Sequence, residues 1–570
     1  MTERNMFEIS GPINDKDVRV MRYVRWIKTF PLEKKVDRVE FTCPSLKNKS
    51  VVTFTHQPGE FRYDVRGYET LLPAGGLVTM ARFTPEEEGV YGFRAMNGAC
   101  VVEQGRFVCE KSAHPGFVRI SFGDHRYFSF TDGTPFIPVG LNMVGPLMYQ
   151  LPKELDEFKH MKDPATLGCA EYRRWFRELS AGGGNFVRLW LAHPYFSVDT
   201  GTAGEMDLLM FNKLDKVVEL AGEYGIRLKL CFEYFRTFRE SIFFSKTMKH
   251  PRDGRSPADM KEWFVDHEWQ ALWFRKVEAY TARYGNDPTI AVWELWNEIE
   301  CCETGDWTIQ RDWTRQMLLK LKQLVPGQMV VNSLGSYDRE SSIQCYDDFK
   351  FDEMDFQQVH RYLDQGTPFE ICRTEPVILS TDAVRASRRP DKPVLLAETG
   401  AVNDAHTGPF HYYRMDNDGL IFHDVTFPAF FAGAAGTGQI WHWPEYVDQK
   451  NLWKAYRAFS GLIDGIRPDE EAFIPVELST EQVWFLALKG KRHILAWVRN
   501  RKDNWRTVLR DETMPEVLKG LKFDLNVQGI FEGKASTYWP WQDGVGQAEF
   551  NRGLLALPEF IHGIMVKIQY

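Results

Sequence analysis

The chain has 570 residues, a formal net charge of −8, 44% apolar residues and 26% charged residues. This composition is typical of a soluble globular protein with more than one domain. Basic residues form no run, so neither nucleic acid nor an anionic membrane is expected as a partner. No apolar run is long enough to predict a membrane span. The N-terminus lacks the apolar segment of a secretory signal and the nine cysteines are scattered, so a cytoplasmic, reducing location is expected.

The first 115 residues predict a β-sandwich. Short runs of alternating apolar and polar residues, such as "RVEFTCPS", are separated by turn signals. Residues 116–135 follow as a connecting β-hairpin, because a "DG" turn joins two aromatic strands. We expect this hairpin to form a lid that leads into the next domain.

Residues 136–465 have a different pattern, in which apolar strands alternate with amphipathic helices. Eight strands with intervening helices predict an α/β fold of the (β/α)8 TIM-barrel type. A doubly wound sheet is the alternative, but the eight repeats and the lack of a Gly-rich phosphate loop argue against it. Residues 466–570 return to short strands and predict a second, C-terminal β-sandwich.

Polar and aromatic residues stand at or just beyond the ends of the predicted barrel strands. In this fold, functional side chains gather at the carboxyl ends of the strands. These positions give the candidate site residues Asn142, Arg188, His193, Asn297, Glu298, His360, Tyr362, Glu398, Trp441 and Trp443.

Glu298 and Glu398 end the fourth and seventh predicted strands, which point towards each other across the barrel mouth. Glycoside hydrolysis needs two such carboxyl groups, one protonated and one ionised. An arginine and a tyrosine beside a carboxylate lower its pKa, whereas an apolar, aromatic wall, such as Trp296 near Glu298, raises it.

The segments "WELWNE", "VRLW", "VHRY", "LLAETG" and "IWHW" resemble the strands of the retaining glycoside hydrolases of clan A, the 4/7 superfamily. The resemblance covers the whole barrel, and the flanking regions resemble the β-sandwich domains that accompany such barrels in some bacterial glycosidases. It implies that Glu298 is the acid/base, that Glu398 is the nucleophile and that Asn297 binds the sugar 2-hydroxyl group. It further implies that Arg188 holds Glu398 ionised and that Tyr362 donates to Glu398, so the pKa of Glu398 is expected to be lowered. It also implies that His193 and His360 line the sugar site and that Trp441 or Trp443 is the stacking platform. His442, between the two tryptophans, is expected on the opposite side of the strand.

Several finer points stay open at this stage. The absence of a secretory signal favours exo action on imported oligosaccharides, with loops near 142–170 and 235–264 walling the site. Endo action is the alternative within the class. A non-catalytic carbohydrate-binding protein and a transglycosylase are the alternatives outside it. Neither a metal nor a cofactor is expected, because no ligand spacing or phosphate loop is present. Homo-oligomerisation is left open, and Trp539 and Trp541 could bind glycan if both are exposed.

Overall fold

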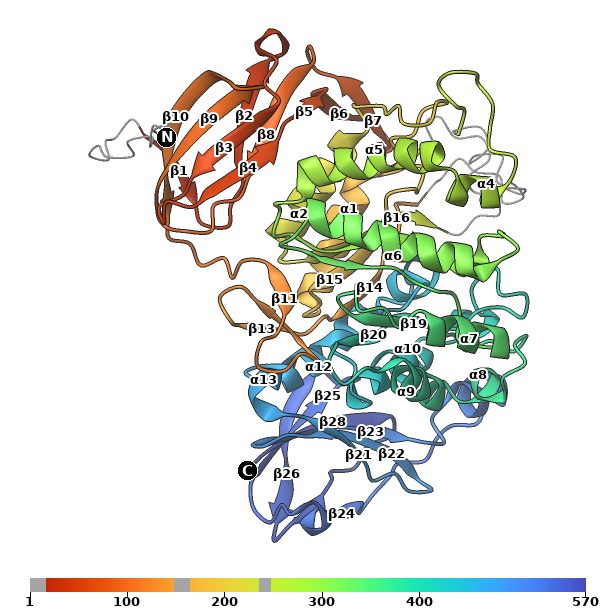
Figure 1. The fold of residues 1–570 in the computed structure, drawn as a ribbon. Coiled ribbons are helices and arrows are strands. Elements are labelled where there is room, and N and C mark those ends of the chain that lie inside the picture. The colour runs from red at the N-terminus through yellow and green to blue at the C-terminus, as the bar shows by residue number, and fades with distance from the viewer. Residues whose placement is uncertain (1–16, 148–164, 235–247) are drawn as a thin grey trace.

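The computed structural model describes residues 17–147, 165–234 and 248–570. The chain runs from N-terminal β-sheets through a central barrel to a C-terminal β-sheet (Figure 1). Each of the nine cysteines is free. Among the described residues, no helix is long and apolar enough to cross a membrane.

The N-terminal region contains a five-stranded sheet, with strand order β1-β10-β9-β3-β4, and a three-stranded sheet, β2-β8-β5. Residues from both sheets, including Trp26, Phe41 and Phe107, share one buried apolar cluster. The strands are β1 (Val18–Met21), β2 (Trp26–Pro31), β3 (Arg38–Thr42), β4 (Asn48–Val52), β5 (Phe54–His56), β6 (Gly59–Tyr63), β7 (Glu69–Pro73), β8 (Val78–Phe83), β9 (Gly89–Asn97) and β10 (Cys100–Glu110).

The predicted connecting hairpin is a small antiparallel sheet of three strands, β11 (Val118–Ile120), β12 (Phe128–Phe130) and β13 (Pro135–Phe136). Phe136 packs against Phe186, and Phe128 packs edge-on against Phe356. These partners lie where two barrel strands begin. The sheet therefore covers the amino-terminal end of the barrel, so the predicted lid lies away from the polar strand ends.

The central region is a barrel of parallel strands. Five strands pair in the order β14-β15-β16-β17-β18, and β19 pairs with β20. A bridge between Ser336 and His360 joins the two groups, and Ile440 bridges to both Leu141 and Thr399 and so closes the ring. The strands are β14 (Gly140–Asn142), β15 (Phe186–Trp190), β16 (Arg227–Tyr234), β17 (Ile290–Asn297), β18 (Met329–Val331), β19 (Gln357–His360) and β20 (Val394–Glu398). The predicted TIM barrel is confirmed, although the eighth position contributes isolated bridges instead of a regular strand.

Helices follow the strands because their apolar faces repeat at helical spacing. The α-helices of the barrel region are α1 (Cys169–Ala181), α2 (Phe211–Glu223), α4 (Met260–Val265), α5 (His267–Tyr284), α6 (Trp307–Leu324), α7 (Glu340–Asp348), α8 (Glu370–Thr374), α9 (Pro376–Ser387), α10 (Leu420–Thr426), α11 (Pro428–Phe431) and α12 (Tyr456–Ile463), and α13 (Pro468–Glu471) leads into the C-terminal sheet.

The C-terminal region is one sheet of eight strands, in the order β21-β22-β23-β28-β25-β26-β27-β24. Phe485, Phe523 and Leu555, from β22, β24 and β27, lie in one buried cluster, so this sheet surrounds a core of its own. The division into two flanking β-sandwiches and the predicted domain boundaries stay predictions. The strands are β21 (Ile474–Glu477), β22 (Val483–Lys489), β23 (His493–Asn500), β24 (Lys522–Asp524), β25 (Lys534–Trp539), β26 (Gly544–Asn551), β27 (Leu554–Ala556) and β28 (Gly563–Gln569).

Trp541 joins the C-terminal sheet to the barrel. Its indole ring lies 3.9 Å from the ring of His423 on α10 and 5.0 Å from the ring of His562. Its Nε1–H donates to the Asp418 carbonyl oxygen at 2.7 Å. Both faces and the polar edge of this ring are thus engaged within the protein, which argues against the glycan-binding role considered for it.

Trp541→Ala is expected to lower the midpoint of thermal unfolding. The partly buried ring should contribute about 2–3 kcal/mol, somewhat less than the roughly 3–5 kcal/mol of a fully buried tryptophan. Differential scanning calorimetry measures the change. Val545→Ala is the matched control, because Val545 is 74% exposed on the same sheet. Equal midpoints for the two variants would show that Trp541 does not hold the sheet to the barrel.

Candidate active site

The carboxyl ends of the barrel strands surround a cavity of about 790 Å³. Glu298, Glu398 and Tyr362 contribute to its wall, as do residues from the loops after three strands. The predicted site residues that line it are His193, Asn297, Glu298, Tyr362, Glu398, Trp441 and Trp443. The loops expected to wall the site fall partly in 148–164 and 235–247, which lie outside the described residues.

Glu298 follows directly after β17 and has a left-handed backbone conformation, with φ 54° and ψ 54°. This conformation is uncommon for a residue other than glycine and costs on the order of 1–3 kcal/mol. Its N–H donates to Ser333 Oγ at 3.1 Å, and its Oε1 lies 2.9 Å from Nδ1 of His360. The turn therefore fixes the direction in which this carboxyl group leaves the barrel strand.

Glu398 is the last residue of β20, and donors occupy both of its oxygens. Arg188 on β15 donates to Oε1, and the Tyr362 hydroxyl donates to Oε2 at 2.7 Å. Arg188 also donates to Oδ1 of Asn297 at 2.6 Å. Hydrogen bonds to a charged acceptor favour its ionised form, so this environment suits an ionised carboxylate.

The two carboxyl groups are close together. One oxygen of Glu298, one oxygen of Glu398 and a ring nitrogen of His360 all lie within 4.8 Å of one another. Retaining glycosidases have carboxyl groups roughly 5–5.5 Å apart, whereas inverting ones separate them by roughly 6.5–9.5 Å to admit a water. The spacing fits direct attack by one carboxylate on the sugar.

Two groups of described residues have the donor types and spacing to hold a metal ion. One is Glu298, His360 and Glu398, and the other is Asp338, Asp364 and His406. In both groups an imidazole nitrogen lies against a carboxylate oxygen, at 2.9 Å for His360 and at 2.8 Å for His406. The donors therefore satisfy one another by hydrogen bonding, and the expectation of no metal stays a prediction.

Burial dominates the pKa values of the carboxyl pair. It raises the pKa of Glu298 well above the usual range, and the negative charges of Glu398 and Glu300 raise it further. Burial also raises the pKa of Glu398, while Arg188 and Tyr362 oppose that rise. The expectation that the pKa of Glu398 falls below the usual range is therefore wrong, because desolvation outweighs the partners. The difference between the two pKa values still has the expected direction. The pKa of Glu298 is raised well above its usual range, whereas the rise for Glu398 is opposed by a directly bonded cation, Arg188.

Three predicted site residues lie beneath the cavity. Arg188, Asn142 and His360 are each fully buried. The Asn142 amide donates to the Ala397 and Gln439 carbonyl oxygens, at 3.1 Å and 3.0 Å, so it links neighbouring barrel strands. These residues support the groups above them and do not form the cavity wall.

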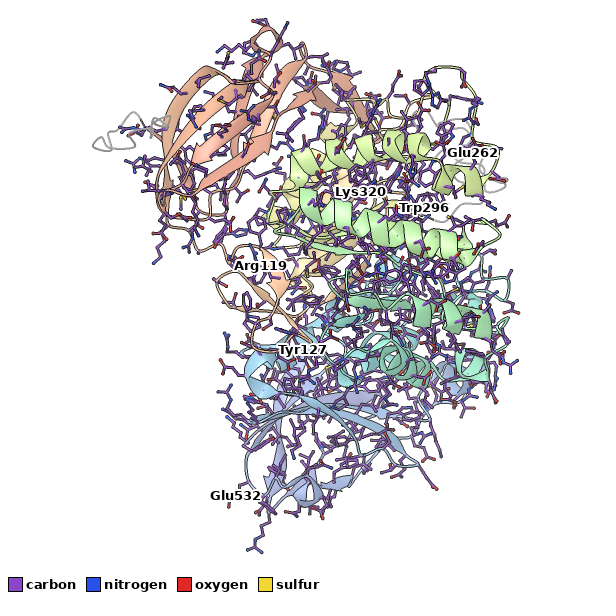
Figure 2. All side chains as sticks on the ribbon, in the orientation of Figure 1. Arg119, Tyr127, Glu262, Trp296, Lys320 and Glu532 are labelled. Atoms are coloured by element: carbon purple, nitrogen blue, oxygen red, sulfur yellow. The ribbon has the colours of Figure 1, made fainter. Side chains whose placement is uncertain are left out.

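Two aromatic orientations differ from those expected. Trp296 packs against Trp263, Trp273 and Trp313, which belong to α4, α5 and α6 and place its ring on the outer side of β17. Figure 2 labels Trp296 between α5 and α6. Trp296 therefore does not wall the site beside Glu298. His442, expected on the opposite side of its strand, lines the cavity with Trp441 and Trp443, because residues 440–443 do not continue as a regular strand.

Two residues of the cavity wall, Trp190 and His406, were not predicted from the sequence. Trp190 lines the cavity, stacks on Tyr234 with ring centroids 4.7 Å apart, and lies 4.9 Å from Trp441. Its position two residues after Arg188 places both on the same side of β15, which is a signal that could have identified it. His406 lines the cavity from the loop after β20, and nothing in the sequence pattern marked this loop position.

Tyr362→Phe is expected to lower kcat/KM by roughly 10–150-fold, because a hydrogen bond to a charged group contributes about 1.5–3 kcal/mol. The Tyr362 hydroxyl lowers the pKa of Glu398. Without it that pKa rises, so the acidic limb of the rate profile should move to higher pH. A pH profile of kcat/KM measures both effects. A uniform loss at all pH values would contradict the electrostatic explanation.

No family model matches the chain. Among curated proteins it is similar to mannan endo-1,4-β-mannosidase 1 of Arabidopsis thaliana, at 24% identity over 49% of this chain and 73% of that protein. It is also similar to mannan endo-1,4-β-mannosidase 4 of Oryza sativa subsp. japonica, at 28% identity over 31% of this chain and 39% of that protein. The match thus spans less than half of the rice relative.

Solved structures show the same fold. A protein from Bacteroides vulgatus ATCC 8482 superposes with a TM-score of 0.56 at 12% identity, covering 97% of this chain and all of that one. A glycoside hydrolase family 5 structure from the same organism superposes with a TM-score of 0.50 at 13% identity, covering 80% and 94%. The comparisons confirm the resemblance to clan A glycoside hydrolases and the enzyme class predicted from it.

Proposed function

We propose that the protein hydrolyses β-1,4-mannosidic bonds by a retaining double displacement, with Glu398 as nucleophile and Glu298 as acid/base. The observation that carries this proposal is the carboxyl pair within 4.8 Å, in which one member bonds directly to a guanidinium group and the other does not. The choice of mannose is supported by the similarity to curated mannan endo-1,4-β-mannosidases.

In the first step, Glu398 attacks the anomeric carbon while Glu298 protonates the leaving oxygen. The sugar–oxygen bond breaks as the sugar–carboxylate bond forms. In the second step, Glu298, now ionised, removes a proton from water, and the resulting nucleophile breaks the glycosyl–enzyme ester. Net retention of anomeric configuration follows from two inversions. Asn297, held by Arg188, lies beside the carboxyl pair and contacts the sugar 2-hydroxyl group.

The aromatic wall gives the sugar an apolar surface to lie on. Trp190, Tyr234 and Trp441 form a continuous group of rings beside the carboxyl pair. Flat aromatic faces bind the C–H faces of a sugar and leave its hydroxyl groups to the polar residues of the cavity. We assign Trp441 as the stacking platform, because Trp443 is more deeply buried.

We propose exo action on short β-linked manno-oligosaccharides. The cavity of about 790 Å³ has the size of a compact ligand pocket, for which the usual range is about 300–1,000 Å³. Endo action is the second candidate, favoured by the names of the curated relatives.

Digestion of reducing-end-labelled mannohexaose separates these proposals. Exo action releases mannose one unit at a time from the unlabelled end, whereas endo action yields internal fragments from the first minutes. A proton NMR spectrum of the earliest product reports its anomeric configuration. Inverted product would overturn the retaining mechanism. Absence of product from mannosides, with turnover of another β-glycoside, would overturn the sugar assignment. Elongated products at high acceptor concentration would indicate transglycosylation, and binding without any product would indicate a carbohydrate-binding protein.

A further inference from the structure

A buried lysine lies in the barrel interior beneath the carboxyl pair. Lys229 interrupts the apolar strand β16 and is fully buried. An ammonium group in such a place is costly unless it is paired. Lys229 is the strand partner of Arg188 on β15, so two cations occupy neighbouring positions of one interior layer.

Two carboxylates share the guanidinium group of Arg188. Its Nε–H donates to Glu294 at 2.6 Å, and one of its terminal nitrogens donates to Glu398. The side chains of all three residues are at most 4% exposed. One positive charge cannot balance two buried negative charges, so a second cation is required for neutrality.

Lys229 supplies that second cation at the far carboxylate. Its ammonium nitrogen lies 3.4 Å from Oε2 of Glu294. It also donates to the side-chain oxygen of Gln358 across the barrel, and the Gln358 amide in turn donates to Oε1 of Glu294 at 2.9 Å. Glu294 thereby has a cation and an amide donor that Glu398 does not share.

We infer that Lys229 is a positioning residue for Glu398: its charge balances Glu294 and leaves the guanidinium group of Arg188 to hold Glu398 ionised. The inference rests on the proposed function, in which ionised Glu398 is the nucleophile. Lys229 does not line the cavity, so it would act on the reaction only through Glu294 and Arg188.

The charges around the cluster agree with this assignment. Burial alone would raise the pKa of Glu294, but Arg188 and Lys229 more than offset it and lower that pKa to about 2. Burial lowers the pKa of Lys229 to about 8, against the opposing effect of Glu294. The positive charge of Lys229, which balances Glu294, is therefore lost as the pH rises through about 8.

Several titratable or charged groups face Glu398 and Lys229. They are Arg188, Cys231, Glu294, Glu298, His360 and Tyr362.

The test is a ¹³C NMR titration of the Glu398 carboxyl group in protein labelled at the glutamate side-chain carboxyl carbon, with the resonance assigned by its loss in Glu398→Gln. Lys229→Met should raise the apparent pKa of Glu398 by about one unit, and Glu294→Gln should lower it by a similar amount. The double variant removes one charge of each sign and should return the pKa to near the wild-type value. Unchanged pKa values in these variants would overturn the inference.

A matched control separates this effect from the loss of any buried ammonium group. Lys276 is also buried and paired, with Asp199 at 2.9 Å and with Glu233, but it bonds to neither member of the carboxyl pair. Lys276→Met should lower stability without moving the Glu398 titration. If Lys229→Met does not fold, Glu294→Gln alone still tests the inference, because the pKa of Glu398 must then fall. Because the titration needs no substrate, failure of the proposed function would appear separately, as absent hydrolysis.

Discussion

Glu398→Gln is expected to lower kcat on an aryl β-mannoside by more than about 10⁴-fold, beyond the roughly 10²–10⁴-fold that a general acid contributes. The amide cannot attack the anomeric carbon as a carboxylate does, yet it has nearly the same shape. The amide oxygen of the variant can still accept from Arg188, while its NH2 group replaces the oxygen that accepts from the Tyr362 hydroxyl. Steady-state kinetics on protein with an unchanged unfolding midpoint measures the loss.

Glu233→Gln is the matched control for this variant. Glu233 is a buried carboxylate on β16, but it pairs with Lys276 and does not line the cavity. The Glu233→Gln variant should retain most of the wild-type activity.

Azide should restore turnover to the Glu398→Ala variant, and the product should be the glycosyl azide of inverted configuration. Retention of more than a tenth of the activity by Glu398→Gln would contradict the assignment of the nucleophile.

Glu298→Gln is expected to lower kcat/KM on manno-oligosaccharides by about 10²–10⁴-fold. The loss should be small on a dinitrophenyl mannoside, whose leaving group needs no proton. Burial raises the pKa of Glu298, and the acid form is the one required, so the wild-type rate should fall as the pH rises through that pKa. The variant has no titratable group at this position, and its alkaline limb should disappear.

Parallel kinetics on the two substrates provides the check on Glu298. Equal losses of kcat/KM for the oligosaccharide and the dinitrophenyl mannoside would show that Glu298 does not donate the proton. Persistence of the same alkaline limb in the variant would assign that limb to another group. Glu300 is the alternative to consider, since burial raises its pKa to about 7 and it lies two residues beyond Glu298.

The barrel, and the strand ends that carry the candidate site residues, could be predicted from sequence because both depend on local patterns. Apolar strands alternate with amphipathic helices, and parallel strands all point their carboxyl ends to one face. Glu298 and Glu398 therefore had to lie on that face. Tyr362 came from the same rule, and it bonds to Glu398 in the structure.

The features that could not be predicted from sequence depend on contacts between segments that are far apart in the chain. Trp296 turns outward because three helices supply an aromatic pocket for it, and the sequence does not state which helix packs over β17. His442 faces the cavity because the chain leaves the extended conformation before it. The sign of the pKa shift of Glu398 could not be predicted, since it is a balance between burial and Arg188.

The retaining mechanism through Glu398 is tested most directly by trapping the covalent intermediate. The wild-type protein is incubated with 2-deoxy-2-fluoro-β-mannosyl fluoride, digested with protease and mapped by mass spectrometry. The fluorine slows both steps, and the good leaving group allows the first, so the ester accumulates. We expect one fluoromannosyl group, attached to Glu398. Attachment to another residue, or inverted product from a mannoside that the protein hydrolyses, would contradict the account.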